Sequence, residues 1–212
     1  MASRTPDAQD SRNVYPPERF SGPAEADLDD EQRRIKDEIE STRTTGLNGP
    51  FGCWLASAAI GDRAQRLGKA CRYDTVFCQR EAELIILITA AFTDCLPEWD
   101  IHLGEARKAG LEESTIAEID KWRGAFGVEA GEGIARACAN GKERLIARLA
   151  VAILEGSGKL EDGLYEECMQ GFGEHREKAI MDCISITGYY TYVAFTLNCF
   201  RVRPLSMGDN AK

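Results

Sequence analysis

The sequence lacks three features that would assign it to large classes of protein: paired cysteines, an excess of basic residues and a long apolar run. Its eight cysteines are scattered, with no C-x-x-C pair and no clustering with the two histidines, so no zinc site or other metal site is indicated. Most of them are therefore expected to be reduced thiols that pack as small apolar residues. They lie at positions 53, 71, 78, 95, 138, 168, 183 and 199.

The charge and the apolar runs exclude two further classes of partner. With 35 acidic and 26 basic residues, the formal charge is −9, and the basic residues are interleaved with acids, which disfavours binding to nucleic acid. The longest apolar run, at residues 84–92, is too short to cross a bilayer, and residues 1–20 have no apolar core typical of a secretion signal. We expect a cytoplasmic protein that binds no membrane.

Helical periodicity dominates the chain and no set of alternating strands is present, so the predicted fold class is all-α, a bundle of helices. The proline-rich residues 1–26 are expected to form an extended arm, residues 27–204 a helical domain, and residues 205–212 a flexible tail. Helices are predicted over residues 27–43, 53–72, 80–92, 95–109, 114–122, 142–154, 161–172 and 174–200, the second of them jointed at Gly61 and Asp62.

Residues 83–102 carry the groups best suited to proton-transfer chemistry. Cys95, Glu98 and His102 follow one another at spacings of three and four, which places them on one face of a helix. An imidazole titrates near neutral pH, and Glu98, one turn earlier, is placed to orient the His102 ring. The alternative is a surface histidine that pairs with Glu98 or Glu105.

Glu83 lies in an apolar run, where an ionised carboxylate needs a partner. Two interpretations are open for Glu83: a catalytic role, or a simple pairing with Arg80. If helices 80–92 and 95–109 are antiparallel, Glu83 and His102 can face each other.

Four further side chains are candidates for the same site. Cys95 at a helix start is exposed to the helix dipole, which lowers a thiol pKa, while the neighbouring Asp94 opposes that effect. Trp54 and Trp99 are candidates for substrate contact, with a place in the core as the alternative. Arg43 is a candidate for holding a substrate carboxylate, with a solvated position at a helix end as the alternative.

Five segments resemble the carboxymuconolactone decarboxylase superfamily, which includes the alkylhydroperoxidase D-like proteins. They are GPFGCWL at 49–55, REAELIIL at 80–87, EWDIH at 98–102, KAGL at 108–111 and GYYTYVAFTLNCFRV at 188–202, and the resemblance extends over about residues 28–204. In the peroxidase branch of that family a second, resolving cysteine follows the first by three positions. Glu83, Cys95 and His102 match the other positions of that peroxidase motif, but Glu98 occupies the place of the resolving cysteine. The resemblance of EWDIH at 98–102 therefore favours the decarboxylase branch.

The resemblance implies a cofactor-independent lyase or isomerase that moves a proton on a small organic acid, lactone or polyketide-like ring, with decarboxylation as the named reaction. A thiol peroxidase that uses Cys95 alone and a non-catalytic binding or assembly protein are the alternatives. The resemblance also implies a homo-oligomer, either a trimer or a hexamer, with a dimer as the alternative.

Overall fold

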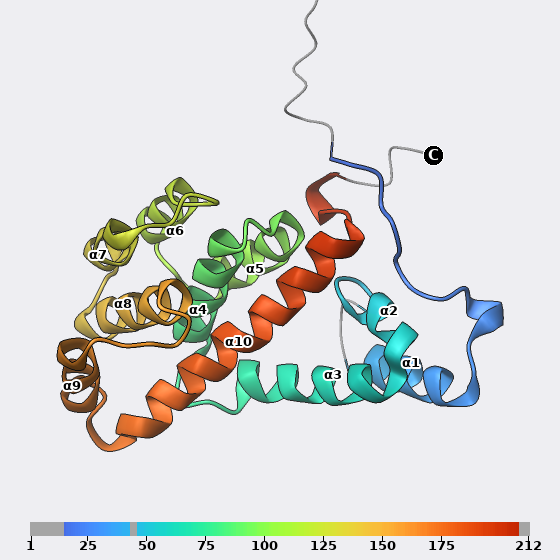
Figure 1. Ribbon diagram of the computed structural model, residues 1–212, viewed down its shortest axis with the longest axis horizontal. Helices are drawn as coiled ribbons and strands as arrows, with labels where there is room; N and C mark the ends of the chain where they lie inside the picture. The colour runs from blue at the N-terminus through green and yellow to red at the C-terminus, as the bar shows by residue number, and fades with distance from the viewer. Residues whose placement is uncertain (1–14, 43–45, 208–212) are drawn as a thin grey trace, which may run out of the picture.

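The structure is a computed structural model that describes residues 15–42 and 46–207, apart from the side chains of residues 42 and 128. The described residues form helices joined by short loops and contain no strand, so the all-α fold class is confirmed. Figure 1 shows the arrangement of the helices. In chain order they are α1 (Asp30–Thr42), α2 (Phe51–Trp54), α3 (Ala58–Tyr73), α4 (Gln79–Phe92), α5 (Leu96–Lys108), α6 (Glu113–Lys121), α7 (Val128–Ala137), α8 (Gly141–Glu155), α9 (Asp162–Gly171) and α10 (Arg176–Phe200).

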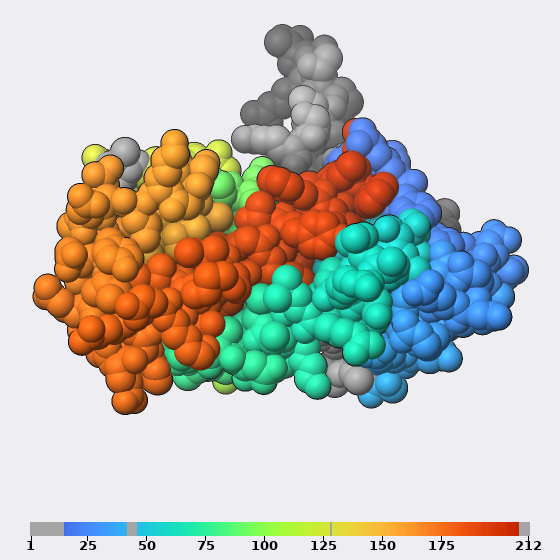
Figure 2. Space-filling view, turned by 60° about the horizontal axis from the view of Figure 1, so that its bottom comes forward, coloured from blue at the N-terminus to red at the C-terminus, as the bar shows by residue number. Residues whose placement is uncertain are grey.

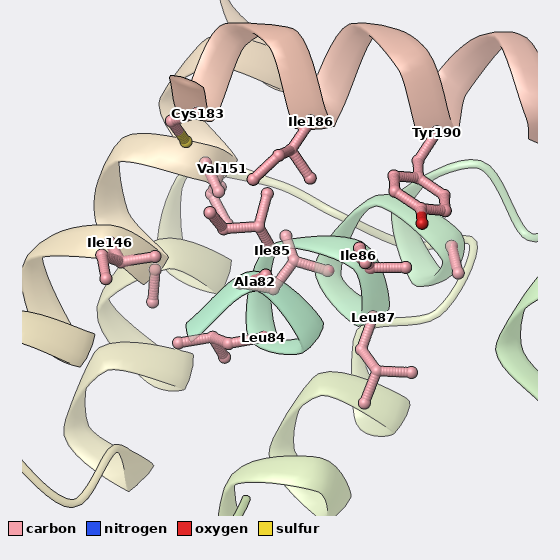
Figure 3. Close-up of a cluster of buried hydrophobic side chains, with 14 of the residues drawn as sticks. Ala82, Leu84, Ile85, Ile86, Leu87, Ile146, Val151, Cys183, Ile186 and Tyr190 are labelled. Atoms are coloured by element: carbon pink, nitrogen blue, oxygen red, sulfur yellow. The ribbon is translucent and has the colours of Figure 1, made fainter. Parts of the chain in front are cut away.

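Helix α4 is the centre of the core. It packs against α5, α8 and α10, and its residues 81–91 are all buried. Figure 3 shows its leucine and isoleucine side chains beneath Ile186 and Tyr190 of α10 and beside Ile146 and Val151 of α8. A helix that is apolar on every side is stable only when other elements surround it, and this explains why the run 84–92 contains so few polar residues.

The N-terminal part of the chain builds a second, smaller apolar cluster. Leu28, Ile35 and Ile39 are buried against Leu55, as the helical period of this segment predicts. Upstream of α1, the arm lies against the C-terminal end of α10. The amide of Arg19 donates to the carbonyl of Phe200 (2.8 Å), and the Phe20 ring contacts the Phe200 ring. None of the helices in the described parts of the chain is both long and apolar enough to cross a membrane.

Two details of the predicted helices are wrong. The joint in the segment 53–72 is a short 3-10 turn at Leu55–Ser57, whereas Gly61 lies inside α3, where its backbone packs closely against Trp54. The apolar period of this segment also predicts Ala59 and Leu67 as inward positions, but half of the Leu67 surface is exposed and Ala59 is exposed as well. At the C-terminus, Leu205–Met207 form a 3-10 helix whose Ser206 donates to Asp100 of α5, and residues 208–212 lie outside the described residues.

Helix α7 was not predicted. Its sequence contains Gly131 and Gly133, which are typical of loops. In the structure a Cβ on Gly133 would lie 2.9 Å from Glu118 and 3.1 Å from Trp122, whereas one on Gly131 would be in ordinary contact with Val151 at 3.4 Å. Neither glycine ends the helix, and Gly133 lies close to the side chains of its neighbours.

Candidate active site

A tight turn between α4 and α5 brings the candidate site together. Asp94 adopts a left-handed conformation (φ 46°), which Asp tolerates better than most residues, and the Cys95 amide donates to the carbonyl of Ala90 (2.9 Å). The two helices then pack side by side, so that Glu83 on α4 and His102 on α5 face each other. His102 Nδ1 lies 2.6 Å from Glu83 Oε2, and both side chains are almost fully buried.

The other ring nitrogen of His102 also has a carboxylate partner. Its Nε2 atom lies 3.1 Å from Oε1 of Glu98, one helical turn earlier, which is itself 2% exposed. An ionised carboxylate only accepts hydrogen bonds, so two such partners require that both ring nitrogens carry a proton. Burial alone lowers the pKa of His102, but the charges of Glu83 and Glu98 outweigh that effect and raise its pKa to about 9. The imidazole is therefore protonated at neutral pH.

Glu83 is held by a further pair of donors that the sequence analysis did not find. Gln79 Nε2 donates to Glu83 Oε1 (2.7 Å), and Arg72 Nη2 of α3 lies 3.3 Å from the same oxygen. Arg72 Nη2 also donates to Glu105 Oε2 (2.8 Å), while its Nε atom is buried and has no partner among the described residues. Gln79 had a sequence signal, since it precedes Glu83 by one helical turn. Arg72 had none, because only the fold brings α3 to α4.

A cavity of about 560 Å³ opens beside these groups. Its wall includes His102, Glu98 and Tyr190, and the side chains of Phe51, Lys69, Arg72, Glu105 and Lys108 also line it. The Tyr190 ring meets the His102 ring edge to face, with centroids 5.1 Å apart, and burial raises the pKa of the tyrosine well above its usual value. Tyr190 belongs to the GYY motif of α10 and is labelled in Figure 3, but the sequence analysis did not assign it to the site.

Three of the four remaining candidates, Cys95, Trp54 and Trp99, do not line this cavity. Cys95 is fully buried at the start of α5 and is absent from the described lining, and burial raises the pKa of its thiol to about 12. Trp54 donates to the hydroxyl of Thr196 (3.1 Å) behind the cavity wall, and Trp99 packs beneath the guanidinium of Arg123. Arg43 lies outside the described residues. Among those that are described, no three His, Cys, Asp or Glu side chains are arranged to hold a metal ion.

The fold and one segment of the sequence resemble known proteins. The structure resembles the crystal structure of an alkylhydroperoxidase AhpD core, an uncharacterized peroxidase-related protein from Ralstonia eutropha JMP134. The TM-score is 0.67 at 18% identity, over 90% of this chain and 94% of that one, so the likeness is one of fold. Residues 58–140 match the model of the Carboxymuconolactone decarboxylase family. No curated protein matches the sequence.

The matched segment runs from α3 to the end of α7 and so contains Arg72, Glu83, Glu98 and His102. The family match covers this segment, which is less than half of the chain, and the similar crystal structure agrees with it in fold. The superfamily that the sequence resembles includes both decarboxylases and peroxidases, so the resemblance alone does not determine the reaction.

Proposed function

We propose that this protein is a cofactor-independent acid–base enzyme that transfers a proton on a small organic acid, lactone or polyketide-like ring, with decarboxylation as the named reaction. The observation that supports it is the His102 imidazole, held between two buried carboxylates at the wall of a 560 Å³ cavity. A buried imidazole whose pKa is displaced by neighbouring charges is typical of catalytic sites.

The roles of the three groups follow from their positions. Glu83 has no contact with the cavity and holds the Nδ1 proton, so it fixes the orientation and the charge of the ring. His102 and Glu98 both line the cavity and share the Nε2 proton.

When a carboxylated substrate loses carbon dioxide, the electrons of the broken bond remain as an enolate. The shared proton then moves to the enolate carbon, and bulk water later reprotonates the pair. Lys69 and Lys108 line the same cavity, together with the carboxylates of Asp100 and Glu105, the second of which is paired with Lys108.

The test is to incubate the purified protein with γ-carboxymuconolactone and with related β-keto acids. We expect turnover in the wild type and a loss of about 100-fold or more in His102→Gln and Glu83→Gln, because a placed acid contributes about 10²–10⁴-fold to such steps. Cys95→Ala is the matched control and should retain its rate. Unchanged turnover in both site variants, with the fold intact by circular dichroism, would remove them from the mechanism.

A thiol peroxidase that uses Cys95 is the second candidate function, since the similar crystal structure is described as peroxidase-related. A peroxidatic cysteine must be a thiolate that peroxide can reach, whereas the Cys95 side chain is fully buried and its pKa is raised to about 12. Mass spectrometry after brief treatment with peroxide separates the two functions. Selective sulfenic acid at Cys95 would favour the peroxidase, and an unmodified Cys95 favours acid–base catalysis. Thermal shifts on ligand addition without any turnover would instead indicate a binding protein.

A further inference from the structure

Tyr190 of α10 carries a hydroxyl group that the fold itself does not use. Its side chain is only 5% exposed, yet the hydroxyl has no hydrogen-bond partner among the described residues. The hydroxyl oxygen is not one of the buried polar atoms without a partner, so it remains accessible from the cavity that Tyr190 lines. Figure 3 shows the side chain pointing away from the α10 backbone, with this oxygen at its tip. Buried polar groups normally have a partner, so we expect this hydroxyl to meet one from outside the chain.

The free hydroxyl lies among the charged groups of the candidate site. The Tyr190 ring contacts the His102 ring, with centroids 5.1 Å apart. The charges of Glu98, Glu83 and Arg72 all act on the hydroxyl. Arg72 and Tyr190 line the cavity from α3 and α10, two helices that pack against each other. Figure 2 shows α10, in orange and red, crossing one face of the molecule with α3 beside it. A ligand in the cavity that touches His102 can therefore also contact the Tyr190 hydroxyl.

The two cationic groups beside the hydroxyl are already paired. His102 Nε2 lies 3.1 Å from Glu98 Oε1, and Arg72 Nη2 donates to Glu105 Oε2 (2.8 Å). Burial raises the pKa of Tyr190 well above its usual value, so the hydroxyl keeps its proton at neutral pH. Tyr190 is thus a neutral donor whose hydrogen bond is still available to a ligand.

We propose that Tyr190 is a further catalytic residue, whose hydroxyl donates a hydrogen bond to a carbonyl oxygen of the substrate and then to the enolate oxygen. The inference rests on the proposed acid–base function and narrows its substrate class. The substrate is an acid whose leaving carboxylate is attached to a carbon conjugated with a ketone or lactone carbonyl. Only such an acid gives an enolate with an oxygen that Tyr190 can bind.

The step that Tyr190 assists needs no further reactant. The bond between carbon and carboxylate breaks, carbon dioxide leaves, and the electron pair moves through the conjugated system to the carbonyl oxygen. Tyr190 keeps its proton, and its hydrogen bond to that oxygen strengthens as negative charge develops there. The proton that ends on carbon comes from the pair of His102 and Glu98. Tyr190 therefore stabilises the charge, whereas His102 supplies the proton.

Steady-state kinetics of Tyr190→Phe test the proposal, because this variant removes only the hydroxyl. With γ-carboxymuconolactone or the β-keto acid that the wild type turns over, we expect kcat to fall about 100-fold. KM should change less than about threefold, since the hydrogen bond is stronger to the enolate than to the bound substrate. Tyr192→Phe is the matched control: it removes a hydroxyl from the same helix outside the cavity lining and should keep the wild-type rate. A wild-type kcat in Tyr190→Phe would overturn the proposal, while inactivity of His102→Gln would still support the acid–base function.

Thermal unfolding separates this role from a structural one. Because the hydroxyl has no partner in the fold, Tyr190→Phe should unfold within about 2 °C of the wild type. A much lower unfolding temperature would show that the hydroxyl supports the fold, and would overturn the proposal.

Binding of 4-nitrophenolate tests the same hydrogen bond without any turnover. This aromatic anion resembles an enolate, and its absorbance allows a direct titration. We expect equal affinity in the wild type and Tyr192→Phe, and about tenfold weaker binding in Tyr190→Phe, because the lost hydrogen bond is to a charged oxygen. 4-Nitroanisole lacks the anionic oxygen and should bind all three proteins alike.

The binding result also distinguishes the two proposals from each other. If the wild type turns over none of the acids but its affinity for 4-nitrophenolate depends on Tyr190, the proposed reaction is wrong and the assigned oxyanion donor is supported. Equal affinities of the wild type and Tyr190→Phe for 4-nitrophenolate, or no binding by the wild type, would overturn the role of Tyr190.

Discussion

At the scale of single residues, the site depends on one histidine with a carboxylate at each ring nitrogen. His102 Nδ1 faces Glu83 and Nε2 faces Glu98, and all three side chains are removed from water. Burying three separate charges would cost much free energy, but the attraction between the imidazolium and its two carboxylates offsets a large part of that cost. Arg72 and Gln79 contact the remaining oxygen of Glu83. The arrangement thus stabilises the charged form of the imidazole.

This arrangement predicts how stability depends on pH. The pKa of His102 is about 9 in the folded protein and 6.5 as a free side chain, so the folded state binds this proton more tightly. Its contribution to stability is fully present below pH 6.5 and is lost as the pH rises towards 9. Urea unfolding followed between pH 6 and 9 should show a falling free energy of unfolding in the wild type and a smaller fall in His102→Gln. An equal fall in both proteins would contradict the assignment of the proton to His102.

At the scale of the elements, burial differs sharply among the helices. Helix α4 is enclosed on all sides, whereas α3 and α10 each bury one face and leave apolar side chains exposed on the other. Sequence periodicity indicated that all three are helices, but it did not distinguish a helix covered by the same chain from one that leaves an apolar face open. Only the packing of the neighbours decides this.

Two leucines with different environments provide a test of this contrast. Leu84 of α4 is fully buried, while Leu67 of α3 is 50% exposed. Leu84→Ala should cost about 2–5 kcal/mol, because it removes buried methyl groups and leaves a cavity in a rigid core. Leu67→Ala should cost less than about 1 kcal/mol in the monomer. Chemical denaturation of both variants measures the difference. Similar losses in the two variants would show that α4 is not the central element of the core.

At the scale of the whole molecule, segments far apart in the sequence meet along α10. Arg19 hydrogen-bonds to residues 199 and 200, and the Phe20 ring packs against the Phe200 ring, some 180 positions later. Near the middle of α10, Tyr190 reaches the His102 ring of α5. Helix α10 therefore links the N-terminal arm and the candidate site.

The arm contact predicts an effect of Phe20 on global stability. Phe20→Ala removes the ring that packs on Phe200 at a centroid distance of 5.3 Å, and we expect a loss of about 1–2 kcal/mol. Tyr165→Ala removes an aromatic side chain that is 40% exposed and makes no ring contact among the described residues, and it should be nearly neutral. Thermal unfolding of both variants checks the prediction. A Phe20→Ala protein as stable as the wild type would show that the arm does not contribute.

The sequence by itself determined the local features. Apolar periodicity defined most helices, the Glu98 and His102 spacing placed both residues on one face, and the segments around 49–55, 80–87 and 98–102 indicated the superfamily. These features depend on residues within one or two helical turns of each other, where periodicity is directly visible. Helix α7 was not predicted, because its two glycines are typical of loops and their surroundings in the folded chain have no local signature.

The tertiary structure alone decided which side chains meet. It placed Arg72 of α3 and Tyr190 of α10 at the site with Glu83 and His102, and it left Cys95, Trp54 and Trp99 off the cavity wall. The charge state of His102 also depends on this assembly, since it requires carboxylates from two helices and the exclusion of water. Contacts between distant helices arise from the packing of the whole core, and no spacing within a single helix encodes them.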